Sequence, residues 1–207
     1  MIYSAVVLTH NCADSLSGCL SSLSSAKEII IIDDLSTDNT LKIAKKFTPH
    51  IYSRHLNNDF AAQRNFGLAK TKSDWVMFLD SDEILSPPLK QAIAALPNHP
   101  SVNGYYIPRQ DLFLSQTIHF GEMGHTRLLR LGNKNYGSWT RSVHEIWKIS
   151  PPLTSLFAPI FHRRHISLTS FINRLNSYTD INRGQLLQEN KGFSYKELLK
   201  PPIKFLY

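Results

Sequence analysis

Cysteine is scarce in this 207-residue sequence, which contains only Cys12 and Cys19. The two residues form no CxxC pair and have no His or Cys partners at zinc-site spacing, which argues against a zinc or dithiol redox site. We expect them on one helix, about two turns or ~10 Å apart, which is too far for a disulfide. Two unpaired thiols, buried or half-buried, fit a reducing cytoplasm.

Long apolar runs are also missing. No stretch of about 18 apolar residues occurs, so the sequence predicts no membrane-spanning helix. The N-terminal run MIYSAVVLTHNC has no basic region before it and is broken by Thr9, His10 and Asn11. It therefore predicts a first strand and not a signal peptide.

Acidic residues are fewer than basic ones, 16 against 23, which gives a net charge of +7 and a pI near 9.4. This surplus favours anionic partners such as a membrane surface, a nucleotide or a phosphorylated substrate. The Lys and Arg residues are scattered and are not grouped with exposed aromatic residues, which argues against a nucleic-acid partner. With 42% apolar residues, the chain is long enough to bury one sizeable core.

The first hundred residues alternate strand-like and helix-like patterns. Apolar runs at residues 2–8, 28–32, 51–52 and 75–79 predict strands. Three helices are expected between them, capped in the second and third cases by Ser36 or Thr37 and by Asn58. This alternation predicts βαβ units and a parallel sheet. Residues 104–114, 126–131 and 143–149 predict further strands, and residues 167–189 predict an amphipathic helix.

Polar clusters follow three of these strands, where ligands bind in open parallel sheets. They are Thr9-His10-Asn11, Asp33-Asp34 and Asp80-Ser81-Asp82-Glu83. The Asp33-Asp34 pair fits a turn with a helix cap, or a carboxylate that accepts hydrogen bonds from a nucleotide.

The acidic cluster at residues 80–83 is the sharper signal. Asp80 and Asp82 can present oxygens to one divalent cation, since Mg²⁺ and Mn²⁺ prefer carboxylate, water and phosphate oxygens. A bound cation would offset the repulsion within the cluster. A solvated acidic turn is the alternative, with Glu83 as a helper or a helix-start residue.

Other charged side chains allow two interpretations each. Arg64 can reach a diphosphate, or it can lie on a helix surface. His144 and Glu145, in RSVHEIW, place an acid or base beside a strand edge. Arg127 and Arg130, in TRLLRL, can bind phosphate or line an exposed face.

Taken in order, AVVLTHNCADSLSGCLSSL, EIIIIDDLSTDNT, AAQRNFGLAKTKSDWVMFLDSDE and SVHEIW resemble glycosyltransferase family 2, the inverting nucleotide-sugar transferases of GT-A fold. The resemblance is closest to the branch of bacterial lipopolysaccharide-core glucosyltransferases, which FHRRHISLTSFINRLNSYTDI also resembles. It covers essentially the whole chain and is strongest over residues 1–85. It implies an α/β fold: a Rossmann-like, mostly parallel central sheet flanked by helices, with a C-terminal helical segment.

The resemblance also implies a division of the chain. Residues 1–165 would form the catalytic domain, with a nucleotide-sugar-binding half at 1–85 and an acceptor-side half at 86–165. Residues 166–207 would form a helical segment whose end, YKELLKPPIKFLY, is typical of membrane-surface segments. A plain C-terminal helix is the alternative. Relatives in this branch continue further, so we expect a C-terminal acceptor-binding or membrane-associated portion to be missing.

By position, the resemblance assigns several residues to the donor nucleotide. Thr9 and Asp34 would contact a uridine-type nucleotide, and Asp33 would support their loop. Arg64 would reach the diphosphate. Asp80 would contact the ribose or the metal.

The resemblance also implies a divalent cation and a general base. Asp80 and Asp82 form the DxD motif, with Asp82 as the direct ligand of Mg²⁺ or Mn²⁺. His162 would approach the metal or the diphosphate. Glu145 would be the general base, with His144 as the alternative.

The implied function is inverting transfer from a UDP-linked sugar to a cell-envelope glycan or glycolipid, such as lipopolysaccharide core. The expected location is the cytoplasm, with peripheral contact to the inner face of the cytoplasmic membrane. A truncated or decayed relative that binds nucleotide without catalysis is one rival. A phosphatase with an aspartyl nucleophile is another, although its DxD usually follows the first strand, which here ends in Thr-His-Asn.

Overall fold

The computed structural model describes residues 1–113, 116–117 and 126–163. Its elements, in chain order, are β1 (Ser4–Thr9), α1 (Ala13–Ser22), β2 (Glu28–Asp33), α2 (Thr40–Ala44), β3 (Ile51–Ser53), α3 (Phe60–Lys70), β4 (Trp75–Asp80), β5 (Glu83–Leu85), α4 (Pro87–Ala95), β6 (Gly104–Phe113), β7 (Gln116–Thr117), β8 (Arg127–Asn133), the 3-10 helix η1 (Lys134–Tyr136), β9 (Gly137–Thr140), β10 (Ile146–Ile149), β11 (Leu153–Ser155) and β12 (Ile160–Arg163). None of the helices described is long and apolar enough to cross a membrane.

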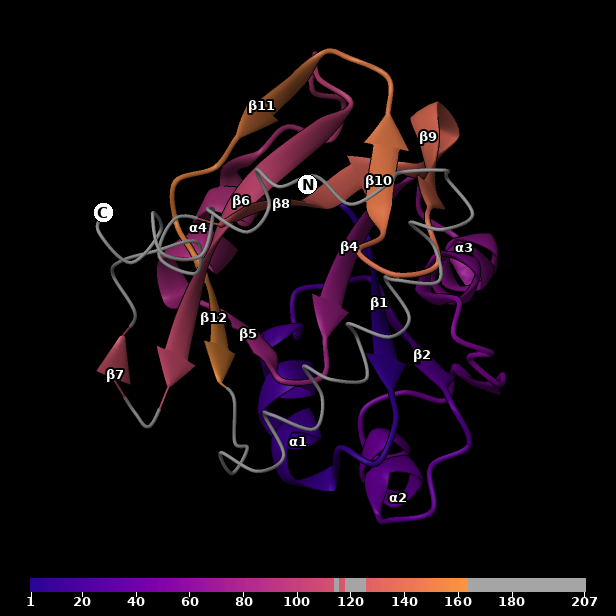
Figure 1. Ribbon diagram of the computed structural model, residues 1–207. Helices are drawn as coiled ribbons and strands as arrows, with labels where there is room; N and C mark the ends of the chain where they lie inside the picture. Colours follow the sequence, from indigo (N-terminus) through magenta and orange to yellow (C-terminus); the bar gives the residue numbers. More distant parts are fainter. Residues whose placement is uncertain (114–115, 118–125, 164–207) are drawn as a thin grey trace, which may run out of the picture.

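The N-terminal half is the predicted βαβ arrangement. Strands β3, β2, β1 and β4 lie side by side in that order, and every pair among them is parallel. All four carboxyl ends therefore meet at one edge of the sheet. The three polar clusters predicted from the sequence begin at this edge, at the last residues of β1, β2 and β4 (Figure 1).

The C-terminal half extends the same sheet with mixed strands. Strand β8 pairs antiparallel with β4 and with β6, and β12 lies between β6 and β5. With β7 and β11 paired to β6, the sheet has ten strands. The β9–β10 hairpin forms a separate two-stranded sheet. The expectation of a central sheet flanked by helices is confirmed, and the antiparallel pairs belong to its second half.

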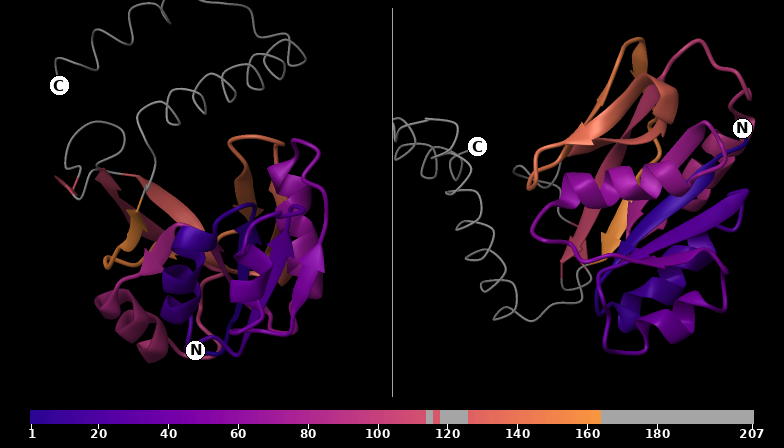
Figure 2. Two further views of the ribbon diagram at one scale, coloured as in Figure 1. Left: turned by 90° about the horizontal axis from the view of Figure 1, so that it is seen from below. Right: turned by 90° about the vertical axis from the view of Figure 1, so that its right-hand side faces the viewer.

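Each central strand alternates its side chains between two apolar cores. Val7, Ile31 and Met77 pack on one face with residues of α1, α2 and α4. On the other face, Val6 and Phe78 pack with α3 and with the tryptophans of the β9–β10 hairpin. Because both faces are covered, the strands read as continuous apolar runs. The second view in Figure 2 shows α3 on the face opposite α1 and α2.

The two predicted helix caps were wrong. Asn58 has a left-handed φ of 56°, whereas a cap needs an extended backbone, and Asp59 accepts the capping bond from the Ala62 amide instead. Neither Ser36 nor Thr37 is a cap, because α2 begins after Asn39, which makes no side-chain capping bond.

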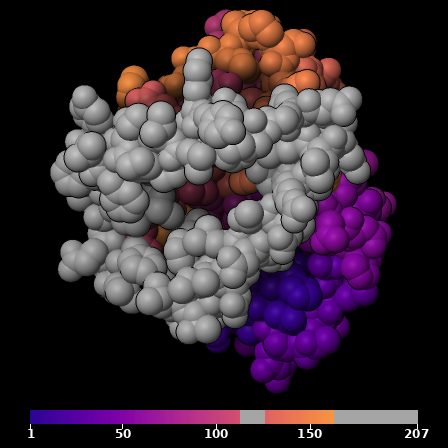
Figure 3. Space-filling model, in the orientation of Figure 1, coloured from indigo at the N-terminus to yellow at the C-terminus, as the bar shows by residue number. Residues whose placement is uncertain are grey.

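The strand predicted at residues 143–149 is shorter, since β10 begins at Ile146 and pairs with β9. His144 and Glu145 therefore lie in the loop before it, and His144 has a φ of 50°. The helix expected at 167–189 and the segment 166–207 lie outside the described residues. In space-filling form, N-terminal residues in indigo and purple occupy the lower right of the view of Figure 1, and orange residues of the later strands its top (Figure 3).

Candidate active site

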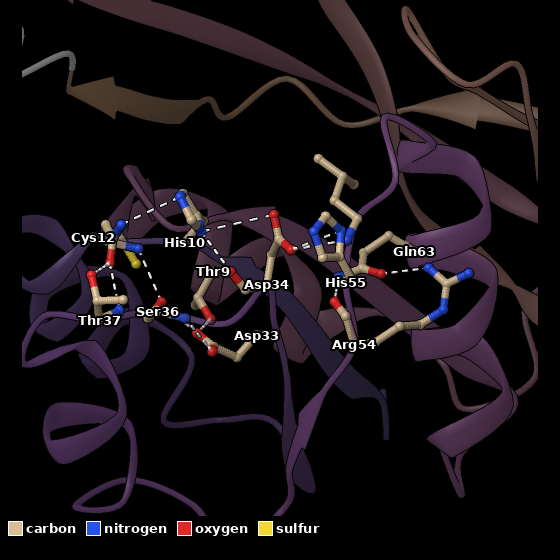
Figure 4. A network of polar contacts seen from close by, with 12 residues as sticks. Thr9, His10, Cys12, Asp33, Asp34, Ser36, Thr37, Arg54, His55 and Gln63 are labelled. Atoms are coloured by element: carbon tan, nitrogen blue, oxygen red, sulfur yellow. Dashed lines mark hydrogen bonds and ion pairs between the residues drawn. The ribbon is translucent and has the colours of Figure 1, made fainter.

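The ends of β1 and β2 are joined through a buried carboxylate. Asp33 is fully buried, and its Oδ1 accepts hydrogen bonds from the hydroxyls of Thr9 (2.8 Å) and Ser36 (2.6 Å). Its Oδ2 accepts from the Ser36 amide at 2.8 Å. Asp33 thus fixes the loop after β2 against β1 through the contacts drawn in Figure 4.

Asp34, the next residue, lies half-buried at the mouth of this loop. Its Oδ1 accepts a hydrogen bond of 2.9 Å from the Leu56 amide, and its carboxylate lies 3.8 Å from both His10 and His55. The two imidazoles are exposed and flank the carboxylate in Figure 4. Asp34 is therefore a ligand-accessible carboxylate between two side chains that can carry positive charge.

A second clamp holds the loops after β1 and β2 together. Asn11 Oδ1 accepts hydrogen bonds from the Thr37 amide (2.8 Å) and hydroxyl (3.3 Å), and the Asn11 amide donates to Ser36 Oγ at 3.0 Å. Asn11 has a φ of 45°, a left-handed conformation that asparagine tolerates. These contacts join the loops after β1 and β2 into one surface at the strand ends, here called the nucleotide ledge, which includes Thr9, Asp33 and Asp34.

At the end of β4, Asp80 lies between two guanidinium groups. Arg64 of α3 donates to its Oδ1 at 2.8 Å, and Arg130 of β8 donates to its Oδ2 at 2.6 Å. Burial disfavours the charged form of Asp80, but Arg130 and Arg64 outweigh this and hold its pKa well below the usual value. The positive charge that residues 78–85 lack is supplied by two other elements.

Glu83 is a strand residue of β5 and not a helix-start residue, since α4 begins at Pro87 behind the Ser86 cap. It is fully buried, accepts a hydrogen bond of 3.0 Å from Arg130, and accepts another of 3.0 Å from the Asp80 amide. Burial raises the pKa of Glu83, and the adjacent Arg130 opposes that rise. Glu83 therefore braces the turn that carries Asp80.

Arg64 is not a surface residue. Its side chain is 4% exposed, and it donates through Nε to Glu145 Oε1 at 2.8 Å. Its guanidinium carbon lies 4.6 Å from the ring centre of Trp139 and 5.7 Å from that of Phe78. These faces are cation–π partners, so the planar group is held in one orientation, with Asp80 and Glu145 at its edge.

Asp82 belongs to a second polar chain. Its Oδ2 lies 3.2 Å from His162 Nε2, and His162 Nδ1 contacts the carboxylate of Asp111. Burial disfavours the imidazolium of His162, but Asp111 and Asp82 outweigh it and raise its pKa to about 9. His162 lies opposite Asp111 on β6 and Glu83 on β5, so β12 places it beside the acidic turn.

A cavity of about 380 Å³ opens beside Asp80 and Arg64. Glu145 and His144 line its wall, with the Glu145 side chain 17% exposed and His144 exposed. Residues of β6 and β8 also line it, as do residues of the β9–β10 hairpin. A carboxylate with an accessible oxygen at such a cavity can remove a proton from a bound hydroxyl.

The known proteins that this sequence resembles are glycosyltransferases. The sequence model described as glycosyl transferase family 2 matches residues 4–142. The chain belongs to glycosyl transferase family 2. The lipopolysaccharide core biosynthesis glycosyltransferase LpsC of Rhizobium meliloti is 25% identical, over 98% of this chain and 78% of that protein. The uncharacterized glycosyltransferase YibD of Escherichia coli is 33% identical, over 45% of this chain and 29% of that protein.

A solved structure agrees with the fold. S. aureus TarS 1-349, in complex with UDP-GlcNAc, matches with a TM-score of 0.57 and 16% identity, covering 81% of this chain and 60% of that chain. At this identity the likeness is one of fold alone. The family 2 chain therefore has the mixed α/β architecture of a GT-A glycosyltransferase.

Of the three residues predicted to bind a divalent cation in this family 2 chain, only Asp82 offers a free ligand atom without rearrangement. Asp82 is an accessible carboxylate, and Mg²⁺ and Mn²⁺ are commonly held by one or two carboxylates with phosphate oxygens completing the shell. Both oxygens of Asp80 are occupied by Arg64 and Arg130, and His162 must lose a proton before Nε2 can act as a ligand. Among the described residues, no group of three or more potential metal ligands occurs.

The predicted residues fall into three groups. Thr9, Asp33 and Asp34 lie at the ends of β1 and β2; Arg64, Asp80, His144 and Glu145 line the cavity; Asp82, in the turn between β4 and β5, meets His162 of β12. Arg130 was seen only as a phosphate ligand or an exposed residue, and its pairing with Asp80 was missed. Asp111 was missed entirely, although an acidic residue within a predicted strand rich in Tyr, Ile, Leu and Phe is a signal of a buried partner.

Proposed function

We propose that this chain transfers a sugar from a UDP-linked donor to a cell-envelope glycan acceptor, with inversion at the anomeric carbon. The observation that supports this most directly is the Arg64 bridge. It ties Asp80, at the end of the central strand, to Glu145 on the wall of the cavity. The Arg64 guanidinium thus holds Asp80, on the donor side, and Glu145, the candidate base, at one site.

The ledge formed by Thr9, Asp33 and Asp34 suits the nucleotide. Acidic side chains at such strand ends accept hydrogen bonds from ribose or base, and Asp34 offers a half-buried carboxylate beside two imidazoles. TarS shares the fold and was crystallised with UDP-GlcNAc. Thr9 and Asp34 would contact the nucleotide, and Asp33 would keep their loops in place.

Glu145 would act as the general base. It takes the proton of the acceptor hydroxyl while that oxygen bonds to the anomeric carbon from the face opposite the diphosphate. The electron pair of the breaking bond goes to the diphosphate oxygen, and Arg64, which lines the same cavity, would contact the departing group. Such a base is typically worth ~10²–10⁴-fold in rate. His144 lines the same cavity and is the alternative base.

A divalent cation, when bound, would neutralise charge developing on the diphosphate. Asp82 would hold it, with His162 and Asp80 as the other candidates. His162 can take part only as neutral imidazole, and Asp80 only after one arginine bond is exchanged. Without such an exchange, Asp80 would contact the ribose.

Lipopolysaccharide core is the acceptor that the similarity to LpsC supports. A glycan of that kind would bring the chain to the inner face of the cytoplasmic membrane. The net charge of +7 favours contact with an anionic lipid surface there. The segment YKELLKPPIKFLY, proposed for that contact, lies outside the described residues.

The test is a panel of nucleotide sugars with Mn²⁺, followed by thermal shift and by donor hydrolysis. We expect at least one UDP-sugar to raise Tm and to be turned over. Asp82→Ala should abolish the Mn²⁺-dependent part of both signals. A variant with undiminished hydrolysis would remove Asp82 from the metal site.

A non-catalytic nucleotide-binding relative remains the second candidate. The blocked Asp80 oxygens favour it, since they lie in ion pairs and not open to a cation. UDP binding with neither hydrolysis nor transfer for any donor would decide in its favour.

A further inference from the structure

The part of the cavity wall formed by β6 and β8 carries two arginines that have no role in the proposed chemistry. Arg109 lies on β6 and Arg127 on β8, and both line the cavity. The strands are paired antiparallel, with Pro108 opposite Arg127 and the Arg109 amide bonded to the Thr126 carbonyl at 2.8 Å. The two residues therefore occupy neighbouring positions on paired strands.

Charge around the cavity is unbalanced. Four arginines line it, against the carboxylates of Asp80 and Glu145. Arg64 and Arg130 are neutralised by these two residues and by Glu83. The positive excess thus belongs to the β6–β8 wall.

On that wall, the cations are only partly paired. Arg109 contacts Asp111 at 3.3 Å, a carboxylate that it shares with His162. The buried Nε of Arg109 has no hydrogen-bond partner among the residues that the structure describes. The Arg127 side chain is exposed and makes no ion pair or hydrogen bond with any residue the structure describes. Unpaired guanidinium groups bind phosphate and carboxylate through paired N–H donors.

We propose that Arg127, assisted by Arg109, forms a subsite for a negatively charged group on the acceptor, a phosphate monoester or a carboxylate. This subsite rests on the proposed transferase function and names the class of acceptor for it. The half-exposed Tyr106 and Ile146, at 37% and 48% exposure, line the same cavity and supply apolar surface for the sugar ring.

The position favours the acceptor over the donor. A general base must touch the acceptor hydroxyl, and Glu145 lines this cavity. The donor nucleotide is assigned to the ends of β1 and β2, and none of Thr9, Asp33 and Asp34 is among the residues that line this cavity. An anion held by Arg127 therefore lies on the same molecule as the hydroxyl that reacts.

The experiment uses the full chain with its donor site filled by UDP and Mn²⁺. Binding of glucose 6-phosphate, glucuronate and uncharged glucose is measured by calorimetry or by ligand-observed NMR. We expect at least one anionic sugar to bind at least tenfold more tightly than glucose. Raising the salt concentration should weaken that binding, because an exposed charge pair is screened.

Arg127→Glu is the decisive variant, and Lys45→Glu is its matched control. Both make the same change in net charge, but Lys45 lies exposed at the end of α2, away from the cavity. Arg127→Glu should weaken binding of the anionic sugar by at least tenfold, while Lys45→Glu changes it less than twofold. UDP affinity should respond equally to the two variants.

Three results would overturn the subsite. In one, neither anionic sugar binds better than glucose. In another, Arg127→Glu and Lys45→Glu weaken the anionic sugar equally, which indicates only long-range attraction. In the third, Arg127→Glu selectively weakens UDP, which moves Arg127 to the donor. Failure of UDP itself to bind wild type would instead refute the nucleotide site of the proposed function.

Discussion

Arg64 donates from Nε to Glu145 at 2.8 Å, across 81 residues of chain. Its Nη2 atom donates to Asp80, also at 2.8 Å. The Arg64 guanidinium on α3 therefore fixes both Asp80, the last residue of β4, and Glu145, which precedes β10. A ligand that draws Arg64 away from either partner changes the hydrogen bonding of the other, so the two sides of the site are coupled.

Arg64→Lys should retain charge and lose this bridge, because an ammonium group lacks the planar fork that contacts both carboxylates. We expect turnover to fall by about 10²-fold, the scale of a small misplacement at a reacting centre. Steady-state kinetics with a UDP-sugar measure it. Arg141→Lys is the control, since Arg141 is exposed, and it should stay within twofold of wild type. Full activity in Arg64→Lys would show that the bridge is dispensable.

Glu145→Gln should keep its hydrogen bond from Arg64, since the amide oxygen can accept it, and lose the ability to take a proton. Turnover should drop ~10²–10⁴-fold while UDP affinity, measured by calorimetry, stays the same. His144→Gln is the companion variant. A larger loss in His144→Gln than in Glu145→Gln would transfer the base role to His144.

Arg130→Met should destabilise the fold. It leaves Glu83, fully buried, without its cation, and breaking a buried pair typically costs ~3–5 kcal/mol. Chemical denaturation measures the free energy of unfolding. Arg127→Met, on the same strand but exposed, should change it by no more than ~0.5 kcal/mol. Adding Glu83→Gln to Arg130→Met should recover part of the loss. Equal effects of the two single variants would contradict the pairing.

Cys12 offers a test of the nucleotide ledge. Burial raises the pKa of the Cys12 thiol, and burial raises that of Cys19 well above its usual value. Since only the thiolate reacts, iodoacetamide labelling should be slow near pH 7.5 and should speed up as the pH rises. Half-buried Cys12 should label first and fully buried Cys19 only after unfolding.

The same thiol should be protected by ligand. The Cys12 amide donates to Thr40 at 2.8 Å, between the loops that follow β1 and β2. We expect UDP with Mn²⁺ to slow Cys12 labelling severalfold, as followed by mass spectrometry. In Cys12→Ser, the folded chain should take up no label. Labelling that UDP leaves unchanged would place the nucleotide elsewhere.

Local patterns predicted the N-terminal half of the fold well. The apolar runs became β1, β2 and β4, and the polar residues after them met at one edge, because parallel strands impose that meeting. The helix caps failed because the choice between Asn58 and Asp59 depends on backbone φ, which single residue types do not fix.

Long-range pairings could not be predicted. Arg130 joins Asp80 only because β8 pairs with β4 in a register that the sequence does not display. Asp111 joins His162 only because β12 is inserted between β6 and β5. Residue type marked the acidic cluster at residues 80–83 as one that needs a positive partner, and the tertiary fold decided that Arg64 and Arg130 supply it.

Strand β12 limits how far the chain can be shortened without loss of the candidate active site. It pairs with β5, directly after the acidic turn, and brings His162 to Asp82. The family match ends at residue 142, before Glu145 and before β12. A fragment trimmed to that match would retain the β1 and β2 loops, yet β5 would lose β12, its pairing strand in the described sheet, and Asp82 would lose its contact with His162. The segment that identifies the family, residues 4–142, is thus shorter than the segment needed to assemble the candidate active site, which includes Glu145 and β12.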